Sequence, residues 1–255
     1  MVTMKISVVI NTYNASKLLA RTLESVKEFD EILVCDMEST DNTLDIAREY
    51  GCKIVTFPKK DYTIVEPARD FAIHAASNPW VLVVDADEKV TSELREYLYH
   101  YIEQPDHDDA LFIHRKNMFL GKWIKGSYPD SQLRFMNQTK ATWPTTIHSH
   151  PIIDGTVGHM PKDVKYALVH AGFSVSNQIL KMDVYTDEDL AKRKQESVSF
   201  AQLVFAPLWR FIKYYFIDGA ILDGKAGFIK AYFSANMKFY YLAKVYERQV
   251  SKKHS

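Results

Sequence analysis

The sequence has little cysteine, no excess of either charge and no long apolar run. Two cysteines in 255 residues argue against a disulfide framework and favour a reducing compartment. The formal net charge is zero, so nothing in the composition indicates a nucleic-acid partner. No stretch reaches the roughly 18 apolar residues that span a bilayer, and the first apolar run, which breaks at Asn11, is too short for a secretory signal. We therefore expect a cytoplasmic globular protein.

The first 110 residues alternate between strand patterns and helical patterns. Runs rich in Val and Ile predict strands over residues 5–11, 31–36, 53–57 and 80–84. Amphipathic runs predict helices over residues 16–29, 66–76 and about 92–101, and another between Asp41 and Gly51. This order is typical of an α/β protein, with a mainly parallel sheet and helices on both faces.

The pattern changes after residue 105. A strand is expected over residues 110–114, and the next seventy residues predict loops and short strands over a binding cleft. Helices return from Asp183 onward. A broad apolar stripe covers residues 200–215, and basic and aromatic residues alternate over 225–248.

Residues 80–88 read Trp-Val-Leu-Val-Val-Asp-Ala-Asp-Glu and are the most informative part of the chain. Buried strands do not usually end in three carboxylates, because desolvated like charges repel. A divalent cation would relieve that repulsion, and the carboxyl ends of strands are where open α/β sheets bind ligands. Asp85 and Asp87 therefore predict a metal-diphosphate site. The alternative is a polar turn that only caps the next helix.

Polar residues also follow the first and second strands. The first strand ends in Asn11-Thr12-Tyr13-Asn14 and the second in Cys35-Asp36. Parallel strands would bring these residues to the same edge as Asp85, where the carboxylate of Asp36 can accept a hydrogen bond from a nucleobase or a ribose. The alternative is that Asn and Asp simply start turns here.

These three strand ends, residues 6–14, 34–43 and 85–88, resemble the GT-A glycosyltransferases of family 2. The resemblance implies a GT-A fold with C-terminal amphipathic helices. It also implies that Asp85 faces the ribose or the diphosphate and that Asp87 binds Mg²⁺ or Mn²⁺. The nucleotide-sugar contacts carried over from the family fall on Thr12, Tyr13, Asn14, Asp36 and Arg69.

Residues 119–124, 128–135, 147–148 and 223–228 look like the lipopolysaccharide core β-glucosyltransferase branch. That resemblance implies transfer of a hexose, with UDP-glucose as the expected donor, to a glycolipid or saccharide acceptor at the inner face of the cytoplasmic membrane. Three positions depart from the pattern. Glu38 replaces a small residue, Asp70 replaces an Asn, and Ser149 stands where the branch has Glu.

Family 2 enzymes invert the anomeric centre, so a base must take the proton of the acceptor hydroxyl. Asp130 is the candidate base, because it follows a Tyr-Pro turn in the cleft region; the alternative is a turn residue or a partner for Arg134. His170, at an expected strand end, is the candidate second metal ligand. Lys181 is a candidate phosphate contact, and a solvated lysine is the alternative.

Residues 197–255 carry nine Lys or Arg against three Asp or Glu. This excess lies beside aromatic residues, which suits helices on an anionic membrane surface; core packing and a dimer face are the alternatives. We expect a nucleotide-sugar-binding half over residues 1–110, an acceptor-binding half over 111–195 and a membrane-associating segment over 196–255.

Other functions remain open at this point. An aspartate-nucleophile phosphohydrolase also has Asp-x-Asp at a strand end, but usually at the first strand and without Lys at the position of Lys89. A nucleotidyltransferase would need a Gly-rich N-terminal loop, and residues 1–20 contain no glycine. A non-catalytic, membrane-associated nucleotide-binding module is the third alternative.

Overall fold

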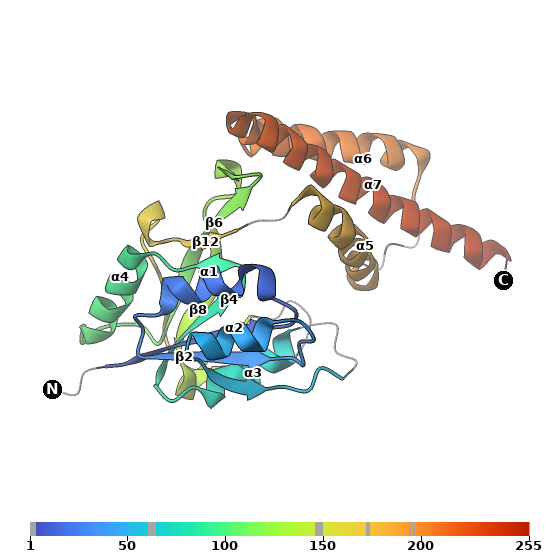
Figure 1. The fold of residues 1–255 in the computed structure, drawn as a ribbon. Helices are drawn as coiled ribbons and strands as arrows, with labels where there is room; N and C mark the ends of the chain where they lie inside the picture. Colours follow the sequence, from blue (N-terminus) through green and yellow to red (C-terminus); the bar gives the residue numbers. More distant parts are fainter. Residues whose placement is uncertain are drawn as a thin grey trace. The chain divides into compact units, whose positions relative to one another are not determined.

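The computed structural model describes residues 4–60, 65–145, 150–171, 174–193, 195 and 197–254. The chain forms two compact units (Figure 1). The first, residues 1–116 and 129–171, contains most of the sheet; the second, residues 117–128 and 172–255, is mainly helical. The three-part division that we expect from the sequence concerns binding roles and stays a prediction.

The sheet of the first unit confirms the predicted α/β order. Strands β1 (Ile6–Thr12), β2 (Glu31–Asp36), β3 (Lys53–Thr56) and β4 (Trp80–Asp85) pair in parallel in the order β3-β2-β1-β4. Beyond β4 the sheet continues antiparallel through β8 (Asp130–Asn137) and β6 (Ala110–Phe119). The short strands are β5 (Glu88–Lys89), β7 (Lys122–Trp123), β9 (Ala141–Thr142), β10 (Ile152–Ile153), β11 (Val157–His159) and β12 (Leu168–His170).

Helices cover both faces of this sheet, as the sequence predicts. Helices α1 (Ser16–Val26), α2 (Thr43–Glu49) and α4 (Ser92–Glu103) share one buried cluster with Ile6, Val8 and Ile10 of β1. Helix α3 (Glu66–Ala75) shares another with Val9 and with β2 residues. Because successive β1 side chains enter opposite clusters, the centre of the strand, residues 8–10, is continuously apolar and not alternating.

Several predicted boundaries are wrong: the helix expected over 16–29 ends at Val26, and two others differ more. Strand β6 runs to Phe119, five residues past the expected end, because Arg115 and its neighbours continue the strand with polar side chains. Helix α5 (Val175–Lys192) begins eight residues before Asp183. Its early apolar residues, Ile179 and Leu180, are exposed, so the usual pattern of one buried face is missing there.

The second unit contains α5, α6 (Phe200–Ile212) and α7 (Gly224–His254), and the tip of the β6–β7 hairpin packs on the start of α7. The backbone N–H of Lys125 donates to Asp223 Oδ1 at 3.2 Å. A Cβ added at Gly227 would lie 1.8 Å from the carbonyl oxygen of Ala220. The segment 223–228 therefore holds the hairpin tip and the turn before α7 against the helix.

We expect Gly227→Ala to destabilise the second unit by about 1–3 kcal/mol, because the added methyl must push the backbone at Ala220 away. Hydrogen exchange should accelerate in residues 117–128 and 213–230 and stay unchanged in β1–β4. The exposed neighbour Lys225→Ala is the control and should shift stability by less than about 0.5 kcal/mol. Equal protection in both variants would contradict this account of the contact.

Candidate active site

The predicted polar strand ends do lie at one edge of the sheet. Thr12 is the register partner of Asp36, and Asn11 is the partner of Asp85. Strand β8 runs antiparallel to β4, so its first residue, Asp130, lies toward the same edge. The carboxyl ends of parallel strands lie at the same edge of a sheet. A neighbouring antiparallel strand places its amino end at that edge.

Asp36 connects the loops after β1 and β2 through hydrogen bonds. Its side chain is fully buried and accepts hydrogen bonds from Thr12 Oγ1 at 2.9 Å, Ser39 N at 2.8 Å and Ser39 Oγ at 2.6 Å. Asn14 N in turn donates to Ser39 Oγ at 2.8 Å, and Asn14 Oδ1 accepts from Thr40 N at 2.8 Å. Three of the residues predicted to contact nucleotide thus belong to one hydrogen-bonded network.

Tyr13 projects from this network into solvent. Its side chain is 47% exposed, and Lys59 Nζ lies 4.7 Å from the ring centroid. Glu38 has φ of +61°, the left-handed region where glycine is usual, and its Oε2 accepts from Lys59 N at 3.1 Å. Glu38, which replaces the small residue usual in the family, therefore links the loop after β2 to the segment that carries Lys59.

Asp85 lies between two arginines. Arg69 Nη2 is 2.7 Å from Asp85 Oδ1, and Arg134 Nη2 is 2.7 Å from Oδ2. Burial alone would raise the pKa of Asp85, but Arg134, Arg69 and Arg115 hold it well below its usual range. Both carboxylate oxygens are engaged, so Asp85 holds Arg69 and Arg134 at the edge, and its predicted contact with the ribose or the diphosphate stays a prediction.

A second chain of charges extends from Asp85 to Asp130. Glu88 is fully buried; its Oε2 accepts from Asp85 N at 2.9 Å, and Arg115 Nη1 lies 3.5 Å from its Oε1. Burial and the charge of Asp85 raise the pKa of Glu88. Arg115 also donates through Nε and Nη2 to Asp130 Oδ2, at 2.9 and 2.6 Å. The partner of Asp130 is therefore Arg115, whereas Arg134 pairs with Asp85.

Arg134 reaches Asp85 because β8 carries a bulge. In the β6–β8 register Leu111 pairs with Phe135 and Phe112 pairs with Leu133, so Arg134 is skipped. The two neighbours of Arg134 enter opposite core clusters, as a bulge allows. The contacts of Arg115, Arg134 and Glu88 were not predictable from the sequence pattern. The only local sign of these residues is a charge inside or beside an apolar strand run.

Asp87 and His170 come together as predicted, although their metal role stays a prediction. Asp87 Oδ2 lies 3.3 Å from His170 Nε2, and Ala171 N donates to the carbonyl oxygen of Asp87 at 2.9 Å. His170 is brought here by the pairing of β12 with β5. Within the described ranges, no three His, Cys, Asp or Glu side chains form a metal cluster. An oxygen and a nitrogen donor on converging segments nevertheless suit Mg²⁺ or Mn²⁺ completed by phosphate and water.

The remaining predicted residues have different outcomes. Asp70, which stands where the family has Asn, accepts a hydrogen bond from Trp143 N at 2.6 Å. Arg69 packs over the Trp143 ring at 4.9 Å, so Asp70 holds the loop segment on which Arg69 packs. Lys181 belongs to α5 in the second unit, and its phosphate contact stays a prediction. His148 and Ser149 lie outside the described residues.

Comparisons with known proteins agree with this geometry. The family model described as "Glycosyl transferase family 2" matches residues 7–154. A glycosyltransferase of Rickettsia typhi, named as uncharacterized, is 30% identical over 261 residues, which cover 95% of this chain and 87% of the relative. The lipopolysaccharide core biosynthesis glycosyltransferase LpsC of Rhizobium meliloti is 26% identical over 264 residues, covering 97% of this chain and 94% of LpsC.

Among solved structures, S. aureus TarS 1–349 in complex with UDP resembles this chain with a TM-score of 0.52 at 16% identity, over 99% of this chain and 92% of TarS. That likeness concerns the fold and confirms the GT-A expectation. The family model covers more than half of the chain, and the Rickettsia relative matches nearly all of it. The chain therefore belongs to glycosyl transferase family 2.

Proposed function

We propose that this glycosyltransferase moves a hexose, with inversion, from UDP-glucose to the heptose of a lipopolysaccharide-core glycolipid. Family membership makes it a nucleotide-sugar transferase and decides against the phosphohydrolase and the non-catalytic module. The donor sugar and the acceptor are our proposals. LpsC, which this chain matches over 94% of its length, supports the acceptor class, and the donor rests on the resemblance given in the sequence analysis. One observation carries the proposal: Asp36, Asp87 and the two arginines paired with Asp85 lie at the same edge of the sheet.

The nucleotide would lie along the ends of β1 and β2. The exposed ring of Tyr13, with Lys59 beside it, offers a stacking face and a positive charge for the base and its phosphates. Arg69 and Arg134 are held at the diphosphate end of this edge by Asp85. Guanidinium groups suit phosphate oxygens because their parallel N–H donors match two acceptors at once.

The metal would be held by Asp87 and His170, which converge to 3.3 Å. A divalent cation bound there would neutralise charge on the departing diphosphate. Asp87 and His170 leave most of an octahedral shell to phosphate oxygens and water, as Mg²⁺ usually requires.

The acceptor proton would go to Asp130. Its Oδ1 accepts from Gln132 Nε2 at 2.9 Å and its Oδ2 is bound by Arg115, so the carboxylate is fixed in orientation beside the donor edge. A base must be held within hydrogen-bond reach of the hydroxyl that attacks. The ion pair with Arg115 fixes the carboxylate for that role.

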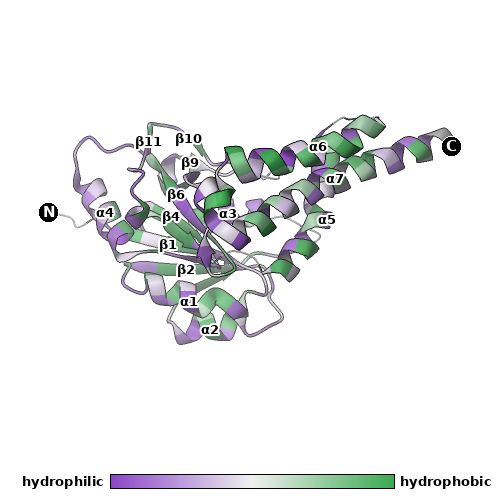
Figure 2. Cartoon of the chain, turned by 90° about the horizontal axis from the view of Figure 1, so that it is seen from above, coloured by the Kyte–Doolittle hydropathy of each residue, from purple (hydrophilic) through white to green (hydrophobic). Residues whose placement is uncertain are grey.

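Contact with an anionic membrane surface is also part of the proposal. Helix α6 is strongly apolar, and Figure 2 shows its hydrophobic colouring. Leu203 and Ala206 pack partly buried against a cluster that includes α7, and no α6 side chain is fully buried. Phe200, Phe205 and Trp209 are 82%, 64% and 59% exposed. Of the helices in the described parts of the chain, none is long and apolar enough to cross a bilayer. An exposed apolar helix in a basic segment suits an in-plane position at the membrane interface.

Asp87→Asn should remove the metal-dependent part of UDP binding, because the neutral amide is a poor ligand for a hard cation. We expect the affinity for UDP in Mn²⁺ to fall about 10- to 100-fold, with little change in chelator, measured by titration calorimetry. Asp45→Asn, on the exposed surface of α2 and paired with Arg48, is the matched control. An unchanged response to Mn²⁺ in Asp87→Asn would remove the metal assignment.

Asp130→Asn should lower kcat by about 10²- to 10⁴-fold while the KM for UDP-glucose stays constant, because only the acceptor proton transfer is lost. The assay is UDP release with inner-core saccharide as acceptor. Arg115→Lys keeps the carboxylate but loses the two-point contact, so it should reduce kcat far less. If both variants lose activity equally, Asp130 has a structural role and another group is the base.

A further inference from the structure

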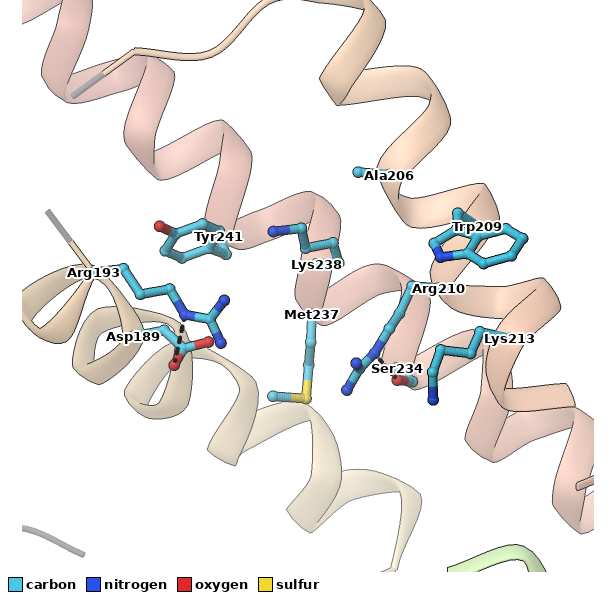
Figure 3. A pocket seen from close by; sticks show the side chains of 10 residues that line it. All are labelled: Asp189, Arg193, Ala206, Trp209, Arg210, Lys213, Ser234, Met237, Lys238 and Tyr241. Atoms are coloured by element: carbon cyan, nitrogen blue, oxygen red, sulfur yellow. Dashed lines mark hydrogen bonds and ion pairs between the residues drawn. The ribbon is translucent and has the colours of Figure 1, made fainter. Parts of the chain in front are cut away.

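The second unit contains a cavity of about 290 Å³ between α5, α6 and α7. Figure 3 shows the side chains around it. Four of the lining residues are cationic and one is acidic: Arg193, Arg210, Lys213, Lys238 and Asp189. No part of the glycosyl-transfer proposal uses this cavity, and a space of this size suits a phosphate headgroup better than a sugar nucleotide.

Among the described residues, two of these cations form no ion pair, although the charge of Asp189 also acts on Lys238. Arg193 Nε is 3.5 Å from Asp189 Oδ1, and Lys213 Nζ is 2.9 Å from Asp218 Oδ1. Arg210 Nε instead donates to Ser234 Oγ at 3.0 Å, and Lys238 Nζ lies 4.9 Å from the Tyr241 ring centroid. In the part of the chain that the structure describes, no carboxylate forms an ion pair with Arg210 or Lys238.

The cations also repel one another. Burial lowers the pKa of Lys238, and the charges of Arg193 and Arg210 lower it further, while the charge of Asp189 offsets part of this effect. An anion in the cavity would replace this repulsion with attraction, and charge-assisted hydrogen bonds to phosphate are among the stronger polar contacts. The cavity is therefore electrostatically prepared for an anion.

The apolar surroundings indicate which anion. Trp209 lines the cavity and is 59% exposed, and the neighbouring Phe205 and Leu208 of α6 are exposed as well. A free phosphate gains nothing from such a surface, and a nucleotide could use only the Trp209 ring, whereas a membrane lipid brings an anionic headgroup and acyl chains together. A Trp beside a basic group at a headgroup level is the arrangement expected at a membrane interface.

We propose that this cavity binds the phosphate of an anionic membrane phospholipid while the exposed side of α6 lies among the acyl chains. The inference deepens the membrane contact in the proposed function and rests on it. Arg210 and Lys238 are the principal phosphate contacts, and Trp209 borders the glycerol and acyl region.

The test compares two double variants of the full chain. Arg210→Gln with Lys238→Gln removes the cavity contacts; Arg248→Gln with Lys252→Gln removes the same charges from exposed positions further along α7. Binding is measured by co-sedimentation with phosphatidylcholine vesicles, with and without phosphatidylglycerol. Soluble dihexanoyl phosphatidylglycerol and inorganic phosphate are titrated separately, to distinguish a lipid from a free anion.

We expect the cavity variant to lose at least about tenfold more affinity for the phosphatidylglycerol vesicles than the control variant. Dihexanoyl phosphatidylglycerol should bind the native chain and not the cavity variant, and inorganic phosphate should bind far more weakly. If the two double variants lose equal affinity for these vesicles, general surface charge explains the binding, and the proposal is overturned. Inorganic phosphate binding as tightly as the lipid would overturn it too.

UDP binding by the cavity variant separates this inference from the proposed function. We expect its UDP affinity in Mn²⁺ and its thermal unfolding to match those of the native chain, because the variant side chains lie in the second unit. A cavity variant that keeps its selectivity for phosphatidylglycerol vesicles, with UDP binding intact, would overturn the lipid site alone. Absence of UDP binding by the native chain would overturn the donor proposal and leave the lipid measurement standing.

Discussion

The pairing of Asp85 with Arg69 and Arg134 is the interaction on which the candidate active site depends. These groups are largely removed from water at the end of a buried strand, where an uncompensated charge is expensive. Removing one partner from such a buried pair typically costs about 3–5 kcal/mol. The arginines therefore make an acidic strand end compatible with the fold, and the same pairing fixes their guanidinium groups at the edge where a diphosphate would lie.

The balance of charge at this edge explains why a cation belongs in the proposed reaction. Four carboxylates and three guanidinium groups meet there: Asp85, Asp87, Glu88 and Asp130 with Arg69, Arg115 and Arg134. Burial and the charge of Asp85 raise the pKa of Glu88, as expected where carboxylates crowd together. A nucleoside diphosphate would add further negative charge, so its stable binding calls for a divalent cation beside Asp87.

The sequence predicts the parallel half of the sheet because each strand and helix there has its own local pattern. The strand ends at Thr12, Asp36 and Asp85 could be assigned to one edge from topology alone, and their register confirms it. The antiparallel half could not be predicted in the same way. Arg134 reaches Asp85 through a bulge that interrupts the two-residue period, and Arg115 pairs with Asp130 only because β6 and β8 are neighbours. Both depend on long-range strand pairing, which leaves no local signal.

The same limit applies to the second unit. Its basic and aromatic composition indicates a surface for an anionic membrane, but the cavity arises from the packing of α5 against α6 and α7. Arg193, Arg210 and Lys238 are far apart in the sequence, and only the folded helices bring their charges to one place. Gly126 and Gly227 are likewise explained only by the folded unit, because a Cβ added at either position would lie 2.3 Å from the carbonyl oxygen of Asp218 or 1.8 Å from that of Ala220.

The most direct test of the central claim is a calorimetric titration of the native chain with UDP, GDP and CMP, in Mn²⁺ and in chelator. If the β1–β2–β4 edge with its arginines and Asp87 is a nucleotide-diphosphate site, UDP should bind saturably in Mn²⁺ and at least about tenfold more weakly in chelator, with GDP and CMP weaker than UDP. No binding of UDP in Mn²⁺, or equal affinity in chelator, would contradict it.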